Sequence, residues 1–331
     1  MRLVIASVSG RIIIVYPNDG FEPLTVLQTV EAEKCTALHG VPTMFIAELD
    51  HPDFDKFDLS SLRTGIMAGS SCPIEVMRRV IDKMHMQEVI IAYGMTETSP
   101  VSCQTNEHTP LEKQVSTVGL VQPALEVKVV DTGTGETLPI GETGELLTKG
   151  YSVMKGYWGS RFKTREAIQD GWMHTGDLAT MDEDGYVKVV GRSKDMVIRG
   201  GENIYPVEIE NYLYRHPKIG DVQVVGIPDE RYGEMLAAWI IPKEGVDLTE
   251  EEVKQFCYDN IAHYKIPAYY RFVTEYPMTI TGKIQKYKII EQMTAELGLA
   301  LIYISIDLYK SFIIQNTAKY LMTPYFCKNV L

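Results

Sequence analysis

The sequence predicts an α/β region, a β-rich region and a small α+β unit, in that order along the chain. Three observations predict this arrangement. Helical patterns alternate with short apolar runs over residues 24–94, and Gly-rich turns separate alternating apolar positions from about residue 115. A compact helix–strand–strand–helix pattern follows from residue 207. Alternation of helices with buried strands is typical of a mostly parallel sheet whose strand ends carry functional loops.

The first region alternates helices and strands. Residues 24–35 carry a helical pattern, and residues 36–45 form a short apolar run. Residues 61–73 indicate a strand and a Gly-rich turn, followed by a helix that Pro73 begins. Residues 89–100 indicate a further buried strand that ends in a polar loop. We therefore expect functional side chains where these two strands end.

Apolar residues are also frequent at both ends of the chain. The two runs before the turn Pro17–Gly20 predict buried strands rather than a signal peptide, because a glycine and an arginine separate them. The run after Leu299 is interrupted by charged residues, so it is shorter than the roughly 20 apolar residues of a membrane span. We expect residues 298–331 to form a divergent tail.

The second half of the chain changes to a β-rich pattern. Residues 125–150 alternate apolar positions with Gly-rich turns, which is typical of β-hairpins. From residue 207 the pattern predicts a helix, two strands and a second helix over residues 249–264, with Thr249 as its N-cap. We expect a first domain over residues 1–192 and a second, of a size typical of small domains, over residues 193–297.

Composition narrows the possible functions. Hydrophobic residues make up 45% and charged residues 23% of the 331 residues, which is ordinary for a globular protein. The net charge of −12 disfavours a nucleic-acid partner held by phosphate attraction. The five cysteines are odd in number and widely spaced, so they predict neither a disulfide framework nor a zinc site and favour a reducing compartment.

Four short clusters contain groups that suit nucleotide chemistry: Tyr93–Glu97, Trp172–Leu178, Gly191–Asn203 and Thr279–Lys286. An aromatic ring can stack on a base, a hydroxyl can bond a phosphate, and a carboxylate can hold Mg²⁺ or ribose hydroxyls. Taken singly, each cluster is at least as typical of a polar loop, a turn, a solvated linker or a surface charge, and a turn is the favoured interpretation for Asp177. A further Gly-rich segment, Asp131–Glu136, lacks a lysine and a following helix, which predicts a hairpin turn rather than a phosphate loop.

The order and spacing of these clusters resemble one family. The chain contains, in that family's order, YGMTE, the segment at residues 144–158, WMHTGDLA, GYVKVVGRSKDMVIRGGENIYPVEIE and TITGKIQK. The pattern resembles the adenylate-forming superfamily of acyl-CoA synthetases, firefly luciferase and peptide-synthetase adenylation domains, over most of residues 20–297. Within it, the sequence is most similar to the mitochondrial medium-chain fatty acid:CoA ligases.

The resemblance implies a fold and a reaction. The fold is the C-terminal part of a large N-terminal domain, with a parallel sheet and a β-rich subdomain, followed by a small mobile α+β domain. The reaction uses ATP and Mg²⁺ to convert a medium-chain fatty acid to an acyl-adenylate, and then transfers the acyl group to CoA. A mitochondrial location is implied by resemblance alone, since we find no transit-peptide pattern.

The resemblance also implies roles for individual residues. Lys283 would bridge the carboxylate and the α-phosphate, Thr96 would contact the phosphate, and Glu97 would hold Mg²⁺. The remaining positions are Gly69 and Ser70 beside the purine, Tyr93 stacked on it, Asp177 and Arg192 on the ribose, Lys194 at the hinge, and Gly200 and Gly201 beside the pantetheine arm of CoA.

The sequence departs from the family in one respect. The Ser/Thr/Gly-rich loop ending in Pro-Lys, with which the family wraps the β- and γ-phosphates, is not found in these residues. Two hypotheses follow. The retained Lys283, Glu97, Asp177 and Arg192 favour an acyl-CoA synthetase, whereas the missing loop favours an inactive isoform that serves as a nucleotide-binding or interaction module.

Overall fold

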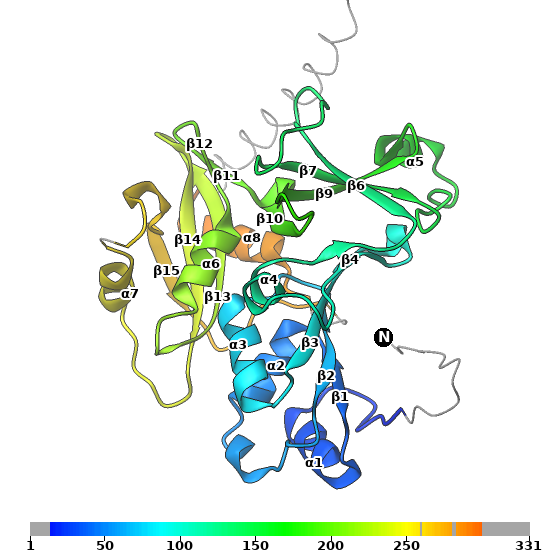
Figure 1. Cartoon of the computed structure of the whole chain (residues 1–331). Helices are drawn as coiled ribbons and strands as arrows, with labels where there is room; N and C mark the ends of the chain where they lie inside the picture. The colour runs from blue at the N-terminus through cyan, green and yellow to red at the C-terminus, as the bar shows by residue number, and fades with distance from the viewer. Residues whose placement is uncertain (1–13, 259, 280–282, 300–331) are drawn as a thin grey trace, which may run out of the picture.

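A computed structural model describes residues 14–258, 260–279 and 283–299 (Figure 1). The helices are α1 (Pro23–Glu33), α2 (Pro42–Leu49), α3 (Ile74–Lys83), α4 (Leu111–Ser116), α5 (Arg161–Ala167), α6 (Pro206–Leu213), α7 (Glu250–Cys257) and α8 (Lys286–Glu296). The strands are β1 (Ala37–Gly40), β2 (Thr64–Ala68), β3 (Glu88–Gly94), β4 (Val101–Gln104), β5 (Leu120–Val121), β6 (Leu125–Val130), β7 (Gly144–Gly150), β8 (Ile168–Gln169), β9 (Trp172–Met181), β10 (Val187–Arg192), β11 (Val197–Arg199), β12 (Glu202–Ile204), β13 (Ile219–Asp229), β14 (Gly233–Pro242) and β15 (Tyr269–Phe272).

The first sheet, sheet A, has the order β1-β2-β3-β4-β5. Its strands β1, β2 and β3 are parallel, while β4 and β5 are antiparallel to their neighbours, so the predicted parallel sheet is confirmed for its first three strands. The apolar side chains of α3 lie on one face of that helix, and they pack with α1 and α2 into a common core. Leu27, Phe45, Met67 and Met77 are completely or almost completely buried there.

Two local expectations for this region are wrong. The run at residues 36–45 is not one strand: Pro42 begins the helix α2 directly after β1, because proline fits the first turn of a helix. Residues 14–20 contain no strand, and Ile14 and Tyr16 are 45% and 60% exposed rather than buried. The other part of the predicted N-terminal strands, residues 1–13, lies outside the described residues.

The second sheet, sheet B, is antiparallel and has the order β10-β9-β7-β6, with β8 paired to β9. The predicted hairpin over residues 125–150 is confirmed by the pairing of β6 with β7. Asp131 Oδ1 accepts hydrogen bonds from the N–H groups of Gly133 and Thr134, which makes this segment the predicted turn.

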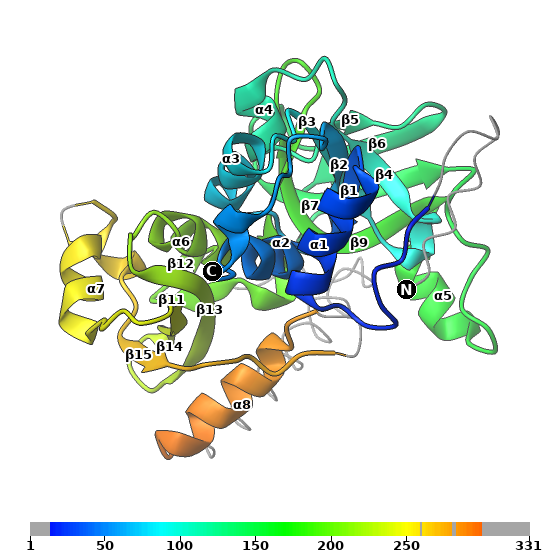
Figure 2. The ribbon, with the colours of Figure 1, turned by 90° about the horizontal axis from the view of Figure 1, so that it is seen from below.

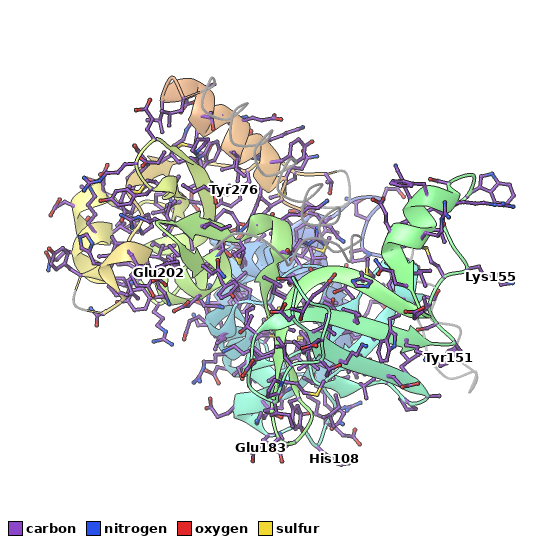
Figure 3. The ribbon with its side chains drawn as sticks, turned by 90° about the horizontal axis from the view of Figure 1, so that it is seen from above. His108, Tyr151, Lys155, Glu183, Glu202 and Tyr276 are labelled. Atoms are coloured by element: carbon purple, nitrogen blue, oxygen red, sulfur yellow. The ribbon has the colours of Figure 1, made fainter. Side chains whose placement is uncertain are left out.

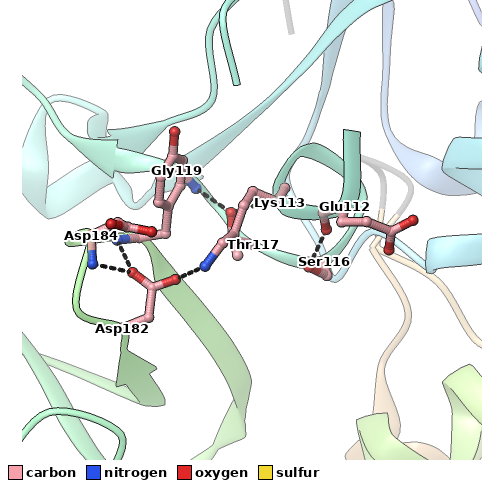
Figure 4. A network of polar contacts seen from close by, with 8 residues as sticks. Glu112, Lys113, Ser116, Thr117, Gly119, Asp182 and Asp184 are labelled. Carbon is pink, nitrogen blue, oxygen red and sulfur yellow. Dashed lines mark hydrogen bonds and ion pairs between the residues drawn. The ribbon is translucent and has the colours of Figure 1, made fainter. Parts of the chain in front are cut away.

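A seam joins sheets A and B, and it consists of backbone and side-chain bonds around α4. Val118 donates to the carbonyl of Val187, and Val187 donates to that of Gly119. The Lys113 ammonium on α4 forms an ion pair with Oδ2 of Asp182 (Figure 4). Oδ1 of Asp182 accepts hydrogen bonds from the N–H groups of Asp184 and Tyr186, which close the turn between β9 and β10. Sheets A and B therefore form one body.

The third sheet, sheet C, has the order β12-β11-β14-β13, with β15 parallel to β14. Helices α6 and α7 pack on one face and α8 on the other, so that α6 and α8 lie on opposite sides of β13 and β14 (Figure 2). Thr249 caps α7 as predicted, in a capping box with Glu252. However, α7 ends at Cys257 instead of reaching residue 264, because Tyr258 takes extended backbone angles.

Residues 300–331, most of the predicted tail, lie outside the described residues. Among the residues that are described, none of the helices has the length and apolar character needed to cross a bilayer.

Glu48 on α2 makes the core sensitive to pH. Its side chain is almost fully buried, and Oε2 has no hydrogen-bond partner among the described residues. Burial raises the pKa of the Glu48 carboxyl from 4.5 to about 8. The unfolded chain therefore loses this proton at lower pH than the folded chain, so the free energy of unfolding falls as pH rises from about 4.5 to about 8.

We expect Glu48→Gln to remove this component and to stabilise the protein increasingly between pH 5 and pH 8 relative to the unchanged chain. Urea unfolding of both proteins at unit steps of pH measures the difference. The exposed Glu33→Gln on α1 is the control. A constant difference between Glu48→Gln and the unchanged chain across this range would contradict the assignment.

Candidate functional site

The end of β3 and the middle of β9 bring two of the predicted residues into direct contact. Tyr93, next to last in β3, donates a hydrogen bond from its hydroxyl to Oδ2 of Asp177 on β9, over 2.7 Å. Only glycine fits at the next position, because the backbone of Pro100 approaches it closely: a Cβ on Gly94 would lie 1.7 Å from the carbonyl oxygen of Pro100. The contact therefore joins a side chain of sheet A to a side chain of sheet B.

Asp177 also faces Arg192. The two residues pair across β9 and β10, and Arg192 Nε lies 3.4 Å from Asp177 Oδ1. The Asp177 side chain is 14% exposed, whereas that of Arg192 is 70% exposed. Burial raises the pKa of the Asp177 carboxyl, against the lowering effects of the Tyr93 hydrogen bond and the Arg192 charge. A largely buried carboxylate beside a solvent-exposed cation is well suited to accept hydrogen bonds from sugar hydroxyls.

The sequence patterns did not reveal the residue that holds this part of β9. Glu145 on β7 accepts a hydrogen bond from the Gly176 N–H at 3.0 Å and contacts His174 Nδ1 at 2.9 Å. The Thr175 hydroxyl donates to the Leu146 carbonyl and accepts from the Asp177 N–H. The β7–β9 register shifts between Glu145 and Leu147, so only the pairing of these strands could have identified Glu145. These hydrogen bonds hold in place the part of the β9 backbone that carries Asp177.

A loop before α5 contacts Glu97. Glu97 lies in the short 3-10 helix η2 (Thr96–Thr98), and its Oε1 accepts a hydrogen bond from the Tyr157 hydroxyl at 2.9 Å. The Met154 N–H donates to the Glu97 carbonyl at 2.8 Å. The same loop continues outward, since Tyr151 and Lys155 lie at the edge of the molecule (Figure 3). Tyr157 was also missed, although it lies inside the motif segment 144–158. Thr96 is exposed beside Glu97.

The turn after β2 contains Gly69 and Ser70, both exposed. Gly69 has φ +97, a conformation that L side chains rarely adopt. This turn leads into α3, whose first N–H, that of Ile74, lies 3.4 Å from the side-chain oxygen of Asn211 on α6. The helix that follows the Gly69–Ser70 turn therefore contacts the C-terminal part of the chain.

Lys194 lies on the segment that connects sheets B and C, and Gly200 and Gly201 lie just beyond it in sheet C. Lys194 is exposed in the 3-10 helix η3 (Ser193–Asp195), directly after β10. Gly200 and Gly201 form the turn between β11 and β12, with φ +60 and +91. A Cβ on Gly201 would meet no atom within 4 Å, so its backbone is open to a ligand from that side.

Lys283 belongs to a different part of the fold from the strands that carry Tyr93, Asp177 and Arg192. It is exposed, and it lies where residues 283–285 pair with residues 277–279, the two paired segments that we call the Lys283 hairpin. The Thr279 N–H donates to the Lys283 carbonyl, and the Lys283 N–H donates to the Thr279 hydroxyl. In the described part of the chain the structure records no bond between Lys283 and that cluster. The structure therefore assembles the residues of sheets A and B and leaves Lys283 on a separate hairpin.

The available side chains limit where a metal ion could bind. No group of three or more His, Cys, Asp or Glu side chains able to hold an ion occurs among the described residues. Mg²⁺ in nucleotide sites is commonly bound through one or two carboxylates and the substrate's own phosphates, so Glu97 alone fits such a role. A separate pocket between α7, β15 and α8 is lined by Tyr269, Tyr270 and Met293 and contains none of the candidate residues.

The sheet arrangement and the cluster at the end of β3 define an adenylate-forming type of enzyme fold. Solved structures agree: the chain matches the anthranilate CoA ligase AuaEII in complex with anthranoyl-AMP with a TM-score of 0.79 and 32% identity, covering 86% of this chain and 55% of that one. ATP-bound MatB from Rhodopseudomonas palustris matches with a TM-score of 0.73 and 32% identity, covering 82% of this chain and 53% of MatB.

The chain belongs to the AMP-binding enzyme family: residues 1–158 match the AMP-binding enzyme domain and residues 208–283 its C-terminal domain. YngI of Bacillus subtilis (strain 168) is 58% identical over 277 residues, which are 83% of this chain and 50% of YngI. The mitochondrial medium-chain acyl-CoA ligase ACSF2 of Danio rerio is 51% identical over 287 residues, 86% of this chain and 47% of the relative. The chain thus spans about half the length of the curated relatives it matches.

Proposed function

We propose that this protein is an ATP-dependent acyl-CoA synthetase acting on medium-chain fatty acids. The observation that carries the proposal is the contact of Tyr93 with Asp177, and of Asp177 with Arg192, at the seam of two sheets in an AMP-binding fold. Similarity to the ACSF2 ligases supports the choice of substrate.

In the proposed reaction the fatty acid carboxylate attacks the α-phosphorus of ATP, and the bond to the pyrophosphate leaving group breaks. Tyr93 stacks on the adenine beside the Gly69–Ser70 turn. Asp177 accepts hydrogen bonds from the ribose hydroxyls, and Arg192 donates hydrogen bonds to them. Lys283 places its ammonium between the carboxylate and the α-phosphate, where negative charge develops. Thr96 bonds a phosphate oxygen, and Glu97 would hold Mg²⁺, which neutralises phosphate charge.

In the second step the CoA thiol, after losing its proton, attacks the acyl carbon, and AMP leaves. We propose that residues 193–297 move as a unit between the two steps, with Lys194 at the hinge. Gly200 and Gly201 then let the pantetheine arm pass close to the backbone. The mitochondrial location stays a prediction, because the relatives include a bacterial protein as well as mitochondrial ones.

The decisive experiment is ATP–pyrophosphate exchange by the purified chain, with octanoate, with leucine and without any carboxylate. We expect exchange that depends on octanoate, because exchange reports reversible adenylate formation. Exchange driven by leucine instead would overturn the substrate assignment. A folded chain that binds AMP in calorimetry but never exchanges would support the alternative hypothesis, a nucleotide-binding module.

We expect Asp177→Asn to weaken AMP binding by about 10- to 100-fold, because a hydrogen bond to a charged acceptor is worth about 1.5–3 kcal/mol. Isothermal titration of the unchanged chain and the variant with AMP measures the effect. Asp82→Asn, an exposed position on α3, is the matched control and should leave the dissociation constant unchanged. Equal affinities for Asp177→Asn and the unchanged chain would refute the ribose role.

A further inference from the structure

Lys286 and Glu210 form an enclosed ion pair at the free edge of β13. Lys286 is the first residue of α8, and its Nζ lies 2.6 Å from Glu210 Oε1 on α6. The side chains are only 18% and 9% exposed. Exposed pairs of this kind contribute little to stability, but removal of one partner of an enclosed pair leaves an uncompensated charge.

The same pair satisfies the backbone of β13. Glu210 Oε1 accepts the Val224 N–H at 2.8 Å, and Lys286 Nζ donates to the Val224 carbonyl at 3.1 Å. Val224 lies on an edge strand, since β13 ends the order of sheet C. The carboxylate and the ammonium therefore take the place of a neighbouring strand, and together they join α6 on one face of the sheet to α8 on the other.

Lys286 comes three residues after Lys283, at the end of one hairpin. The Gln285 N–H donates to the Pro277 carbonyl, Met278 pairs with Ile284, and the Thr279 N–H donates to the Lys283 carbonyl. Both lysines belong to the TITGKIQK motif, but one is exposed and the other is enclosed and bonded. Their environments therefore separate two roles within one motif.

We propose that Glu210 and Lys286 are positioning residues: their ion pair on Val224 fixes the start of α8 and so holds the Lys283 hairpin in place for adenylation. The proposal rests on the proposed function. Misplacement of a reacting group by about 1 Å can cost about 100-fold in rate, so a loosened hairpin should affect the step that Lys283 serves.

The test compares the two half-reactions in Lys286→Met. We expect octanoate-dependent pyrophosphate exchange to fall about 10- to 100-fold, with thioester formation from supplied octanoyl-AMP within about twofold of the unchanged chain. Lys286→Arg, which keeps the charge, should restore most of the exchange. Lys254→Met, which removes the more exposed pair with Glu250 on α7, is the matched control. An equal loss in both half-reactions, or no loss in a folded protein, would overturn the positioning role.

Amide hydrogen exchange provides a readout that does not need activity. We expect the amides of Thr279 and Gln285 to exchange at least 10-fold faster in Lys286→Met and in Glu210→Gln/Lys286→Met, while amides of α7 stay unchanged. The double variant removes both charges and guards against loss of folding from one unpaired carboxylate. If the unchanged chain shows no pyrophosphate exchange, the proposed function fails, whereas unaltered protection of the hairpin would refute the positioning inference itself.

Discussion

Lys283→Ala is expected to reduce octanoate-dependent pyrophosphate exchange by about 100- to 1,000-fold, the usual cost of removing one donor to charge that develops in a transition state. The side chain is exposed on its hairpin, so the substitution should leave the fold intact. Thioester formation from supplied octanoyl-AMP should be preserved, because Lys283 moves with residues 193–297 in the proposed rearrangement and serves only the first step. The two half-reactions are measured separately on the same preparation.

The control for Lys283→Ala is Lys254→Ala on α7, which removes a partly exposed lysine outside the candidate site. It should leave both half-reactions unchanged. If Lys283→Ala retains full exchange, the adenylation lysine is elsewhere. If it loses both half-reactions to the same extent, the lysine has a structural role instead.

Gly65→Ala is expected to lower the free energy of unfolding by about 3 kcal/mol, the upper range of overpacking. Gly65 on β2 pairs with Leu38 on β1, and an added Cβ would lie 1.8 Å from the Leu38 carbonyl and 2.5 Å from Met86 Cε. The parallel strands would have to separate to admit one methyl group. Urea unfolding followed by circular dichroism measures the loss.

Gly20→Ala provides the matched comparison, because an added Cβ there would meet no atom within 4 Å. We expect its free energy of unfolding to stay within about 0.5 kcal/mol of the unchanged chain. Equal stability of Gly65→Ala and Gly20→Ala would mean that β1 does not pair with β2 as described.

The elements with strong local signals could be predicted from the sequence. The helix beginning near Pro73 has apolar positions on one face, and the Thr249–Glu252 capping box is a short-range pattern. Such features depend on residues a few positions apart, which a sequence displays directly. The strand predicted within residues 14–20 was wrong, because apolar composition alone does not show whether a partner strand is present.

The candidate site could be predicted only in part, for the same reason. Tyr93 and Asp177 were identified because they lie in recognisable motifs, and their contact across 84 positions agrees with a shared role. Glu145 and Tyr157 were missed, since their importance comes from a register shift and from a loop that folds back on η2. Long-range pairing of this kind has no signal within any single window of sequence.

The seam between sheets A and B has a consequence for the entropy of ligand binding. The Lys113–Asp182 pair and the backbone bonds of Val187 hold the two sheets together before any nucleotide arrives. The halves of the proposed adenosine site, Tyr93 on one sheet and Asp177 on the other, are therefore already assembled, and a nucleotide bound there need not order them. Loosening the seam far from the nucleotide would weaken binding through a less favourable entropy while every contact to the ligand stayed the same.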